Sequence, residues 1–331
     1  MKKVLVIMLV LLVGMGLVMA AGSSESAKKT YDLKISTSQT EQSLMYKAYD
    51  TFAKRVNEKS DGRLNVSVFA SSQLGNDEDV IEQAIQGAGI AVNTDAARMG
   101  TYVNEMGILM MGFFADDYDE CLKVTQTPQF ARWEDELAEK HKIRVLAFDF
   151  YDGPRHFLTN KPINSPADLK GLTIRTIGAP VCIASIGAMG ATPIAMAWGE
   201  VYNGIQTKAI DGAEAQSTST YPSKIYEVVS YLTKTSHFQL LQGLICGEKW
   251  YQGLPADLQA LLKSTAREVG AESAKWVIEE ADKSEALMVK AGLTIVKPDL
   301  APFKKAVEPA YVKMGYLDLR NEIYKAIGKV Q

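Results

Sequence analysis

The feature that most constrains the fold is a long stretch without proline near the C-terminus. No proline occurs between Pro255 and Gly292. Pro255 suits the first turn of a helix and Gly292 suits its end. Apolar side chains recur between them at helical spacing, at Leu258, Leu261, Leu262, Val269, Trp276, Val277 and Leu287. At about 1.5 Å per residue this helix would be ~50 Å long, which is more than one small lobe needs. We therefore expect a helix that runs across two lobes; two consecutive helices, separated near Gly270, are the alternative.

The rest of the chain from residue 31 alternates between apolar strands and amphipathic helices. Helical periodicity is present in residues 44–60 and 80–85, and two further helical stretches, 301–314 and 317–327, complete the chain. Short apolar strands are expected within residues 33–35, 64–68, 90–93, 143–150, 172–176, 192–195, 209–213 and 293–296. This alternation predicts a two-lobed α/β protein with mainly parallel sheets.

The N-terminus predicts export. Lys2 and Lys3 precede an apolar run over residues 4–13, and Val18 and Ala20 supply small side chains at a cleavage site. This pattern is typical of a secretory signal peptide of residues 1–20, cleaved near Ala20. Residues 21–30 would then be a flexible lead-in. A retained membrane anchor is the alternative, because the apolar run is about long enough to span a bilayer.

Charge and motif content exclude several functions. With 36 Lys and Arg against 39 Asp and Glu, the chain lacks the basic excess that a nucleic-acid binder needs. The cysteines and histidines lie far apart, with no metal-ligand spacing, and there is no nucleophile elbow or phosphate-binding loop. We therefore predict no catalytic residue, no metal, no cofactor and no nucleic-acid partner. The three cysteines are expected to be small buried residues.

Two arginines are the best candidates for contact with a ligand. Arg175 lies in the strand at residues 172–176, and open α/β sheets bind ligands at the carboxyl ends of their strands. A guanidinium presents two parallel N–H donors that match a carboxylate. Arg155 has the same potential. The alternative for both is an ordinary exposed arginine.

Other polar or aromatic positions are weaker candidates. Trp198 can line a pocket or fill the core, and residues 211–217 form a polar run that can hydrogen-bond a ligand. Within this run the candidate binding residues are Glu214 and Gln216. Outside it they are Gln73, Asn93, Thr94 and His237.

Five short strings occur in one order and spacing: SSQLG at 71–75, RHFLTNKP at 155–162, PADLKGLTIR at 166–175, MAWGEVY at 196–202 and IDGAE at 210–214. Together they resemble the substrate-binding proteins of tripartite ATP-independent periplasmic (TRAP) transporters, the family of dicarboxylate-binding periplasmic receptors. The resemblance extends from about residue 31 to the end.

The resemblance implies the two-lobed periplasmic binding protein fold, with hinge strands and a long helix spanning both lobes. Lobe I would comprise residues 31–152 plus about 241–280, and lobe II residues 153–240 plus about 281–331. Members bind organic acids in the cleft between the lobes and deliver them to an ion-gradient-driven membrane permease. We accordingly expect a periplasmic monomer with two partners, a small organic acid and the TRAP membrane subunits.

Within this family, Arg175 matches the arginine that pairs with the ligand carboxylate, and Arg155 matches a second arginine of the cleft. Gln73, Trp198 and the loop after Gly212 fall at cleft positions.

The chain departs from the family pattern at one place. Many members read Gly-Ala-Glu-Asn-Pro where residues 212–216 read Gly-Ala-Glu-Ala-Gln, so the asparagine that hydrogen-bonds the ligand is absent. Either Gln216 replaces it, or the ligand lacks the group that asparagine reads. Two other functions remain open: an exported two-lobed enzyme, for which Asp95, Asp211, Glu214 and His237 are the only acid-base candidates, and a receptor that feeds a sensor kinase.

Overall fold

The computed structural model describes residues 29–329. The predicted signal peptide and most of the lead-in lie outside the described residues, so their cleavage stays a prediction. None of the helices in the described part combines the length and the apolar character needed to cross a membrane.

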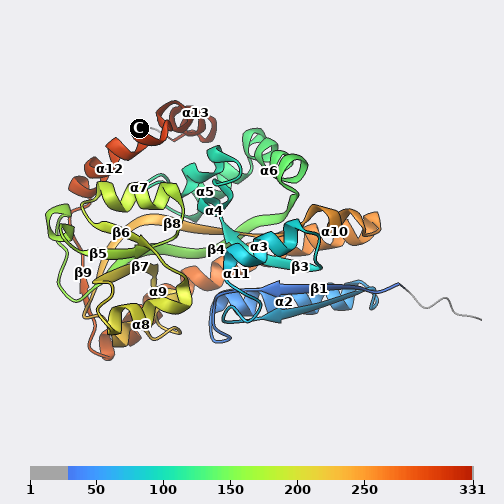
Figure 1. The fold of residues 1–331 in the computed structure, drawn as a ribbon, viewed down its shortest axis with the longest axis horizontal. Helices are drawn as coiled ribbons and strands as arrows, with labels where there is room; N and C mark the ends of the chain where they lie inside the picture. The colour runs from blue at the N-terminus through green and yellow to red at the C-terminus, as the bar shows by residue number, and fades with distance from the viewer. Residues whose placement is uncertain (1–28, 330–331) are drawn as a thin grey trace, which may run out of the picture. The chain divides into compact units, whose positions relative to one another are not determined.

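The described residues form one nine-stranded mixed sheet with helices packed around it (Figure 1). The strand order is β2-β1-β3-β8-β4-β7-β5-β6, and β9 pairs with β8. The strands are β1 (Tyr31–Ser36), β2 (Leu64–Phe69), β3 (Ile90–Asp95), β4 (Ile143–Thr159), β5 (Thr173–Thr176), β6 (Thr192–Ala195), β7 (Gly212–Gln216), β8 (Tyr231–Gly247) and β9 (Thr294–Val296).

Two long antiparallel strands, β4 and β8, form the middle of the sheet. β3 pairs with the C-terminal end of β8, whereas β7 pairs with the C-terminal end of β4, so two strand groups flank opposite ends of this pair. The first group contains β1, β2 and β3, and the second contains β5, β6 and β7. Pairings within each group are parallel, as predicted. β3 and β7 join the central strands in antiparallel orientation.

The register of β4 on β8 is irregular in the stretch between the two groups. It shifts between Tyr151 and Gly153 and again between Arg155 and Phe157. Gly153 has φ +113°, a backbone conformation that an L side chain rarely adopts. The prediction of a strand ending at Phe150 was therefore too short, because β4 continues to Thr159 through these bulges.

The helices cover both faces and ends of the sheet. They are α2 (Leu44–Lys59), α3 (Asp77–Ile85), α4 (Ala96–Met99), α5 (Tyr118–Thr125), α6 (Pro128–His141), α7 (Pro180–Ala188), α8 (Val201–Gln206), α9 (Ser217–Thr220), α10 (Glu248–Gln252), α11 (Ala256–Lys290), α12 (Ala301–Met314) and α13 (Leu317–Ile327), with short 3-10 turns at Asn104–Met110, Pro166–Leu169, Trp198–Glu200 and Ile225–Glu227. Side chains of Ser43, Asn76, Asp95 and Thr127 cap the helices that follow them.

The C-terminal stretch without proline is one continuous helix, α11. This confirms the expectation of a single long helix and excludes two consecutive ones. Gly270 neither breaks nor ends it. A Cβ at Gly270 would lie 2.9 Å from the Cβ of Asp149 on β4, so glycine at this position lets the helix approach the sheet closely.

α11 contacts elements beside both strand groups. In its N-terminal half, Glu268 and Glu272 accept from Arg55 on α2, at 2.9 Å and 2.7 Å. Toward the other end, Glu285 accepts from Lys234 at 2.8 Å and from Ser217 at 3.1 Å. In Figure 1, α2 and β1 (blue) lie at one end of the sheet, and α8 and α9 (yellow) lie at the other.

The core consists of two apolar clusters. The larger one packs around β1, β3, β4 and β8 and extends to β5, α7 and α12, and a smaller one packs between α8 and β7. Cys121, Cys182 and Cys246 are free thiols buried in the large cluster, in agreement with their prediction as small core residues.

Candidate ligand-binding site

A small cavity of about 30 Å³ lies where strands of the two groups end. β1, β3, β5 and β7 all point their carboxyl ends toward it, as expected for a ligand site in an open α/β sheet. Its lining comes from both groups and from β8: Ser38, Gln39, Asp77, Asp95, Arg98, Arg155, Arg175, Ile177, Trp198, Gln216, Leu240 and Gln242.

Arg175 supplies a buried positive charge to this cavity. Arg175 is 2% exposed, and its Nε donates to the backbone oxygen of Met196 at 2.9 Å. The guanidinium lies over the ring of Trp198, 5.5 Å from the centroid. Among the described residues no carboxylate bonds to it, and burial, followed by the charge of Arg155, lowers its pKa to about 10. Arg175 is therefore a buried cation without a counter-anion.

Arg155, in contrast, is neutralised within the protein. Its Nε and Nη2 both donate to the carboxylate of Glu214, the second at 2.9 Å, and both side chains are almost fully buried. Nη1 donates to Oε1 of Gln216 at 2.8 Å, and Thr176 donates to Glu214 at 2.8 Å. This network uses the hydrogen-bonding capacity of Arg155 to hold β4 and β7 in place.

Gln216 links this network to a buried carboxyl, Asp152. Its Nε2 donates to Oδ2 of Asp152 and to Oγ of Ser219, the latter at 3.1 Å. Burial raises the pKa of Asp152 to about 7, against the opposing effects of the Gln216 hydrogen bond and the charge of Arg155. Since Gln216 has donors and acceptor engaged, it lines the cavity as part of a fixed wall.

The raised pKa of Asp152 predicts a pH-dependent stability. The folded protein holds this proton more tightly than the unfolded chain, so the stabilisation is complete below about pH 4 and is lost as pH rises through 7. A shift of this size corresponds to at most about 4 kcal/mol. We expect Asp152→Asn to flatten the fall in unfolding free energy between pH 4 and pH 8, measured by urea denaturation. The exposed Asp282→Asn is the control; an unchanged pH slope in Asp152→Asn would contradict the assignment.

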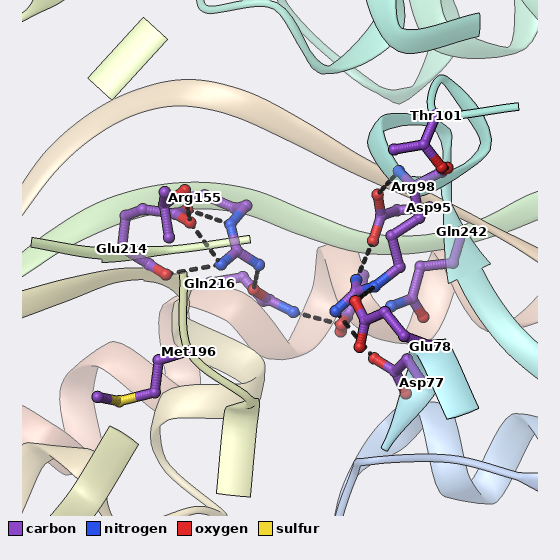
Figure 2. Close-up of polar contacts among 12 residues, drawn as sticks. Asp77, Glu78, Asp95, Arg98, Thr101, Arg155, Met196, Glu214, Gln216 and Gln242 are labelled. Atoms are coloured by element: carbon purple, nitrogen blue, oxygen red, sulfur yellow. Dashed lines mark hydrogen bonds and ion pairs between the residues drawn. The ribbon is translucent and has the colours of Figure 1, made fainter. Parts of the chain in front are cut away.

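The opposite wall of the cavity is built around Arg98. Its guanidinium contacts Asp77 at 3.1 Å, Glu78 at 2.8 Å and Asp95 (Figure 2). Asp95 caps α4 by accepting from the backbone N–H of Arg98 at 2.9 Å. Burial raises the pKa of Asp77, an effect that the charge of Arg98 opposes. Figure 2 shows this acidic group facing the Arg155 network across the site.

The structure brings four of the predicted residues to the cavity and leaves five away from its lining. Arg155, Arg175, Trp198 and Gln216 line it. Asn93 and Thr94 are buried on β3 next to Asp95, and Glu214 lies behind Arg155. Gln73 is exposed on the loop before α3.

His237 is a buried supporting residue rather than a wall of the cavity. Its ring stacks on Phe157 with centroids 4.5 Å apart, and its Nδ1 lies 2.7 Å from Oγ1 of Thr235. Burial, followed by the charge of Arg155, lowers its pKa well below the usual range, so the imidazole is neutral. Among residues 29–329 no group of His, Cys, Asp and Glu side chains is arranged to hold a metal ion.

Several lining residues were not predicted to bind the ligand; Asp95 was named only among the acid-base candidates for an exported enzyme. Asp77 and Asp95 begin helices in acidic or capping positions, which are common at helix N-termini without any ligand. Gln242 belongs to β8, a strand that the sequence patterns did not identify. The sequence contained one indication of this cluster. Asp95 and Arg98 are three residues apart at the start of a helix, a spacing that favours an ion pair.

Three comparisons with known proteins bear on this site. The model of the bacterial extracellular solute-binding protein family 7 matches residues 35–316. The sialic acid-binding periplasmic protein of Vibrio cholerae is 28% identical over 295 residues, covering 89% of this chain and 91% of that protein.

Two solved structures are similar over nearly the whole chain. A TRAP periplasmic solute-binding protein from Actinobacillus succinogenes with bound L-galactonate gives a TM-score of 0.87 at 26% identity, covering 90% of this chain and 100% of that one. The apo open structure of one from Escherichia fergusonii gives a TM-score of 0.78 at 34% identity, covering 91% and 100%.

The family match spans most of the chain, and the fold agrees with solved members along its length. The resemblance inferred from the five strings is thereby confirmed, as is the mixed α/β fold with its long helix. The chain belongs to family 7 of the bacterial extracellular solute-binding proteins, the periplasmic receptors of TRAP transporters, and is a carboxylate-binding transport receptor, not an enzyme.

Proposed function

We propose that this receptor captures a small organic acid at Arg175 and hands it to TRAP membrane subunits. The cavity of about 30 Å³ has room for only a few water molecules, so its walls must move apart to admit the acid. The observation that carries the proposal is the buried guanidinium of Arg175, which lacks a counter-anion among the described residues. A ligand carboxylate supplies that anion, and its two oxygens match the two terminal N–H groups of the guanidinium. Trp198 covers one face of the guanidinium and leaves its edge for the carboxylate.

Arg155 supports this contact from behind. Its ion pair with Glu214 leaves a single uncompensated positive charge on this wall, at Arg175. The like charge of Arg155 also lowers the pKa of Arg175, so an anion bound there relieves an existing repulsion. Gln216 and His237 fix the surroundings of Arg155 and Glu214. Gln73, Asn93 and Thr94 stay predicted binding residues.

Capture requires a motion, and we assign it to two lobes with the predicted boundaries: residues 31–152 plus about 241–280, and 153–240 plus about 281–331. The cavity walls come from the two strand groups, which are joined by β4, β8 and α11. The irregular register around Gly153 provides a place where the central strands can bend. The higher TM-score to the ligand-bound relative than to the apo open one supports a closed arrangement here.

The remaining parts of the proposal concern the cellular setting. Periplasmic relatives support a periplasmic location after signal cleavage near Ala20, and the family supports TRAP membrane subunits as the partner of a monomeric receptor. The relatives described above carry names or ligands that are acids, sialic acid and L-galactonate, which supports an acid for this chain too.

A thermal-shift screen of the mature chain tests the proposed function. Mono-, di- and keto-acids, sugar acids and aromatic acids are added singly, with uncharged sugars as controls. An acid present at 100 times its dissociation constant adds about 2.7 kcal/mol to the unfolding free energy, a clear rise in Tm. At least one acid should give this shift, and the corresponding neutral sugars should not. If no acid shifts the Tm, or if neutral sugars do so equally, the proposal is wrong.

A further inference from the structure

The two walls of the cavity carry opposite charge. On the β5 and β7 side, Arg155 is paired with Glu214 and Arg175 has no ion-pair partner among residues 29–329, which leaves one positive charge. On the other side, Arg98 is the cation for both Asp77 and Asp95, which leaves one negative charge facing the cavity. The exposed Glu78 adds a further negative charge behind this wall.

The acidic wall also presents hydrogen-bond acceptors to the cavity. Asp77 contacts Arg98 through Oδ2 at 3.1 Å, and its side chain is 13% exposed, so the carboxylate can accept further hydrogen bonds. Gln39 is 5% exposed and lines the cavity, and its Oε1 has no partner in the described part of the chain. A buried acceptor without a donor is costly, so Gln39 calls for an O–H or N–H donor from a ligand, and the Asp77 carboxylate beside the cavity can accept another.

Resting on the function proposed above, we infer that the ligand is a monocarboxylic acid that carries several hydroxyl groups. Its carboxylate lies on Arg175, and its hydroxyl groups donate to Asp77 and Gln39 on the opposite wall. An acid of the aldonic or uronic type has this arrangement of one anionic end and a polyhydroxylated body.

A dicarboxylate fits this cavity poorly. With one carboxylate on Arg175, a second one across the cavity meets Asp77 and Asp95, whose charges exceed that of Arg98. Like charges placed together at a desolvated interface cost several kcal/mol. A plain aliphatic acid avoids this repulsion but leaves Gln39 without a donor.

An acid that carries an ammonium group is the main competing class, because the ammonium would meet the excess negative charge. Two observations favour hydroxyl groups. Arg98 already neutralises part of the acidic wall, and the other polar groups around it are amides and a hydroxyl, at Gln39, Gln242 and Ser38. Trp198 is the one aromatic side chain in the lining, and it is already occupied by Arg175.

Calorimetry with six-carbon acids separates these contributions. D-Gluconate, D-galactonate and D-glucuronate represent the hydroxylated monoacids, hexanoate lacks hydroxyls, adipate and D-glucarate carry a second carboxylate, and 6-aminohexanoate carries an ammonium. We expect at least one hydroxylated monoacid to bind about 100-fold more tightly than hexanoate, adipate or 6-aminohexanoate.

The variant Asp77→Asn tests the acidic wall directly. It keeps the shape and removes one charge, so affinity for the hydroxylated monoacid should fall about tenfold or more, whereas the ratio of adipate to monoacid affinity should rise at least as much. Glu78→Gln is the matched control: it removes a charge from the same Arg98, but the Glu78 side chain is 60% exposed and lies outside the lining. Glu78→Gln should leave the ratio nearly unchanged. Gln39→Leu should weaken the monoacid but not hexanoate.

The outcomes separate this inference from the proposed function. Tightest binding by adipate, hexanoate or 6-aminohexanoate, or equal effects of Asp77→Asn and Glu78→Gln on the ratio, overturns the substrate class and leaves the receptor function intact. Failure of every acid in the panel and in the wider screen overturns both.

Discussion

Replacing Arg175 with alanine is expected to lower the affinity for the bound acid at least tenfold. The truncation removes the donors for the ligand carboxylate and leaves that anion desolvated, a loss of ~2–5 kcal/mol. The effect should be large because Arg175 is nearly fully buried and, within the described part of the chain, donates to no acceptor but the backbone oxygen of Met196. Isothermal titration calorimetry with the acid found in the screen measures it.

Two further variants make this result specific. Arg175→Lys should also bind weakly, because a point charge cannot replace a planar fork that donates two parallel hydrogen bonds. Arg132→Ala removes an exposed arginine from α6 and should leave affinity unchanged. Wild-type affinity in Arg175→Ala would refute the assignment of the carboxylate site. Stability should not fall in that variant, since the substitution removes a desolvated charge that forms no ion pair with any residue from 29 to 329.

The Glu214→Gln variant is expected to lose ~3–5 kcal/mol of unfolding free energy, the usual cost of leaving one member of a buried ion pair uncompensated. Glu214 accepts two hydrogen bonds from the Arg155 guanidinium, and both side chains are excluded from water. Guanidinium chloride denaturation measures the loss. Adding Arg155→Met to Glu214→Gln should recover part of it, because the unpaired charge is removed as well.

A second ion pair in which an arginine donates two hydrogen bonds to one carboxylate provides the matched control. Arg144 donates to both oxygens of Glu248, at 2.6 and 2.7 Å, with both side chains partly exposed. Since solvent screens this pair, Glu248→Gln should cost about 1 kcal/mol or less. Equal losses in Glu214→Gln and Glu248→Gln would mean that burial of the Arg155 pair contributes nothing special.

The parts of the fold that depend on local pattern could be predicted. The continuous helical periodicity between Pro255 and Gly292 contained the whole of α11, and the last two helices have the predicted bounds. β8 was missed because it carries Thr, Lys, Ser, His and Gln side chains in a strand buried on most of its length. Those polar groups are tolerated there because β8 lies between β3 and β4 in the sheet. These strands are distant in sequence, so the local pattern of β8 does not reveal the pairing.

The same division holds for the binding site. Arg175 and Trp198 lie in strings whose order is readable along the chain, whereas the ion cluster of Asp77, Asp95 and Arg98 exists because the first turns of α3 and α4 come together near the strand ends. The departure at Ala215 also has a structural explanation. Successive side chains of β7 alternate, so Ala215 faces the smaller core cluster while Gln216 faces the cavity.

The order of strands has a consequence for the newly made chain. β3 is bordered by β8, and α2 is packed by α11, yet both partners are encoded far downstream. The first strand group therefore cannot complete its sheet or cover its helix until the last third of the chain is present. Contacts so distant in sequence form slowly. We expect the growing chain to stay unfolded while it is synthesised, which is the state in which a polypeptide can be threaded across a membrane.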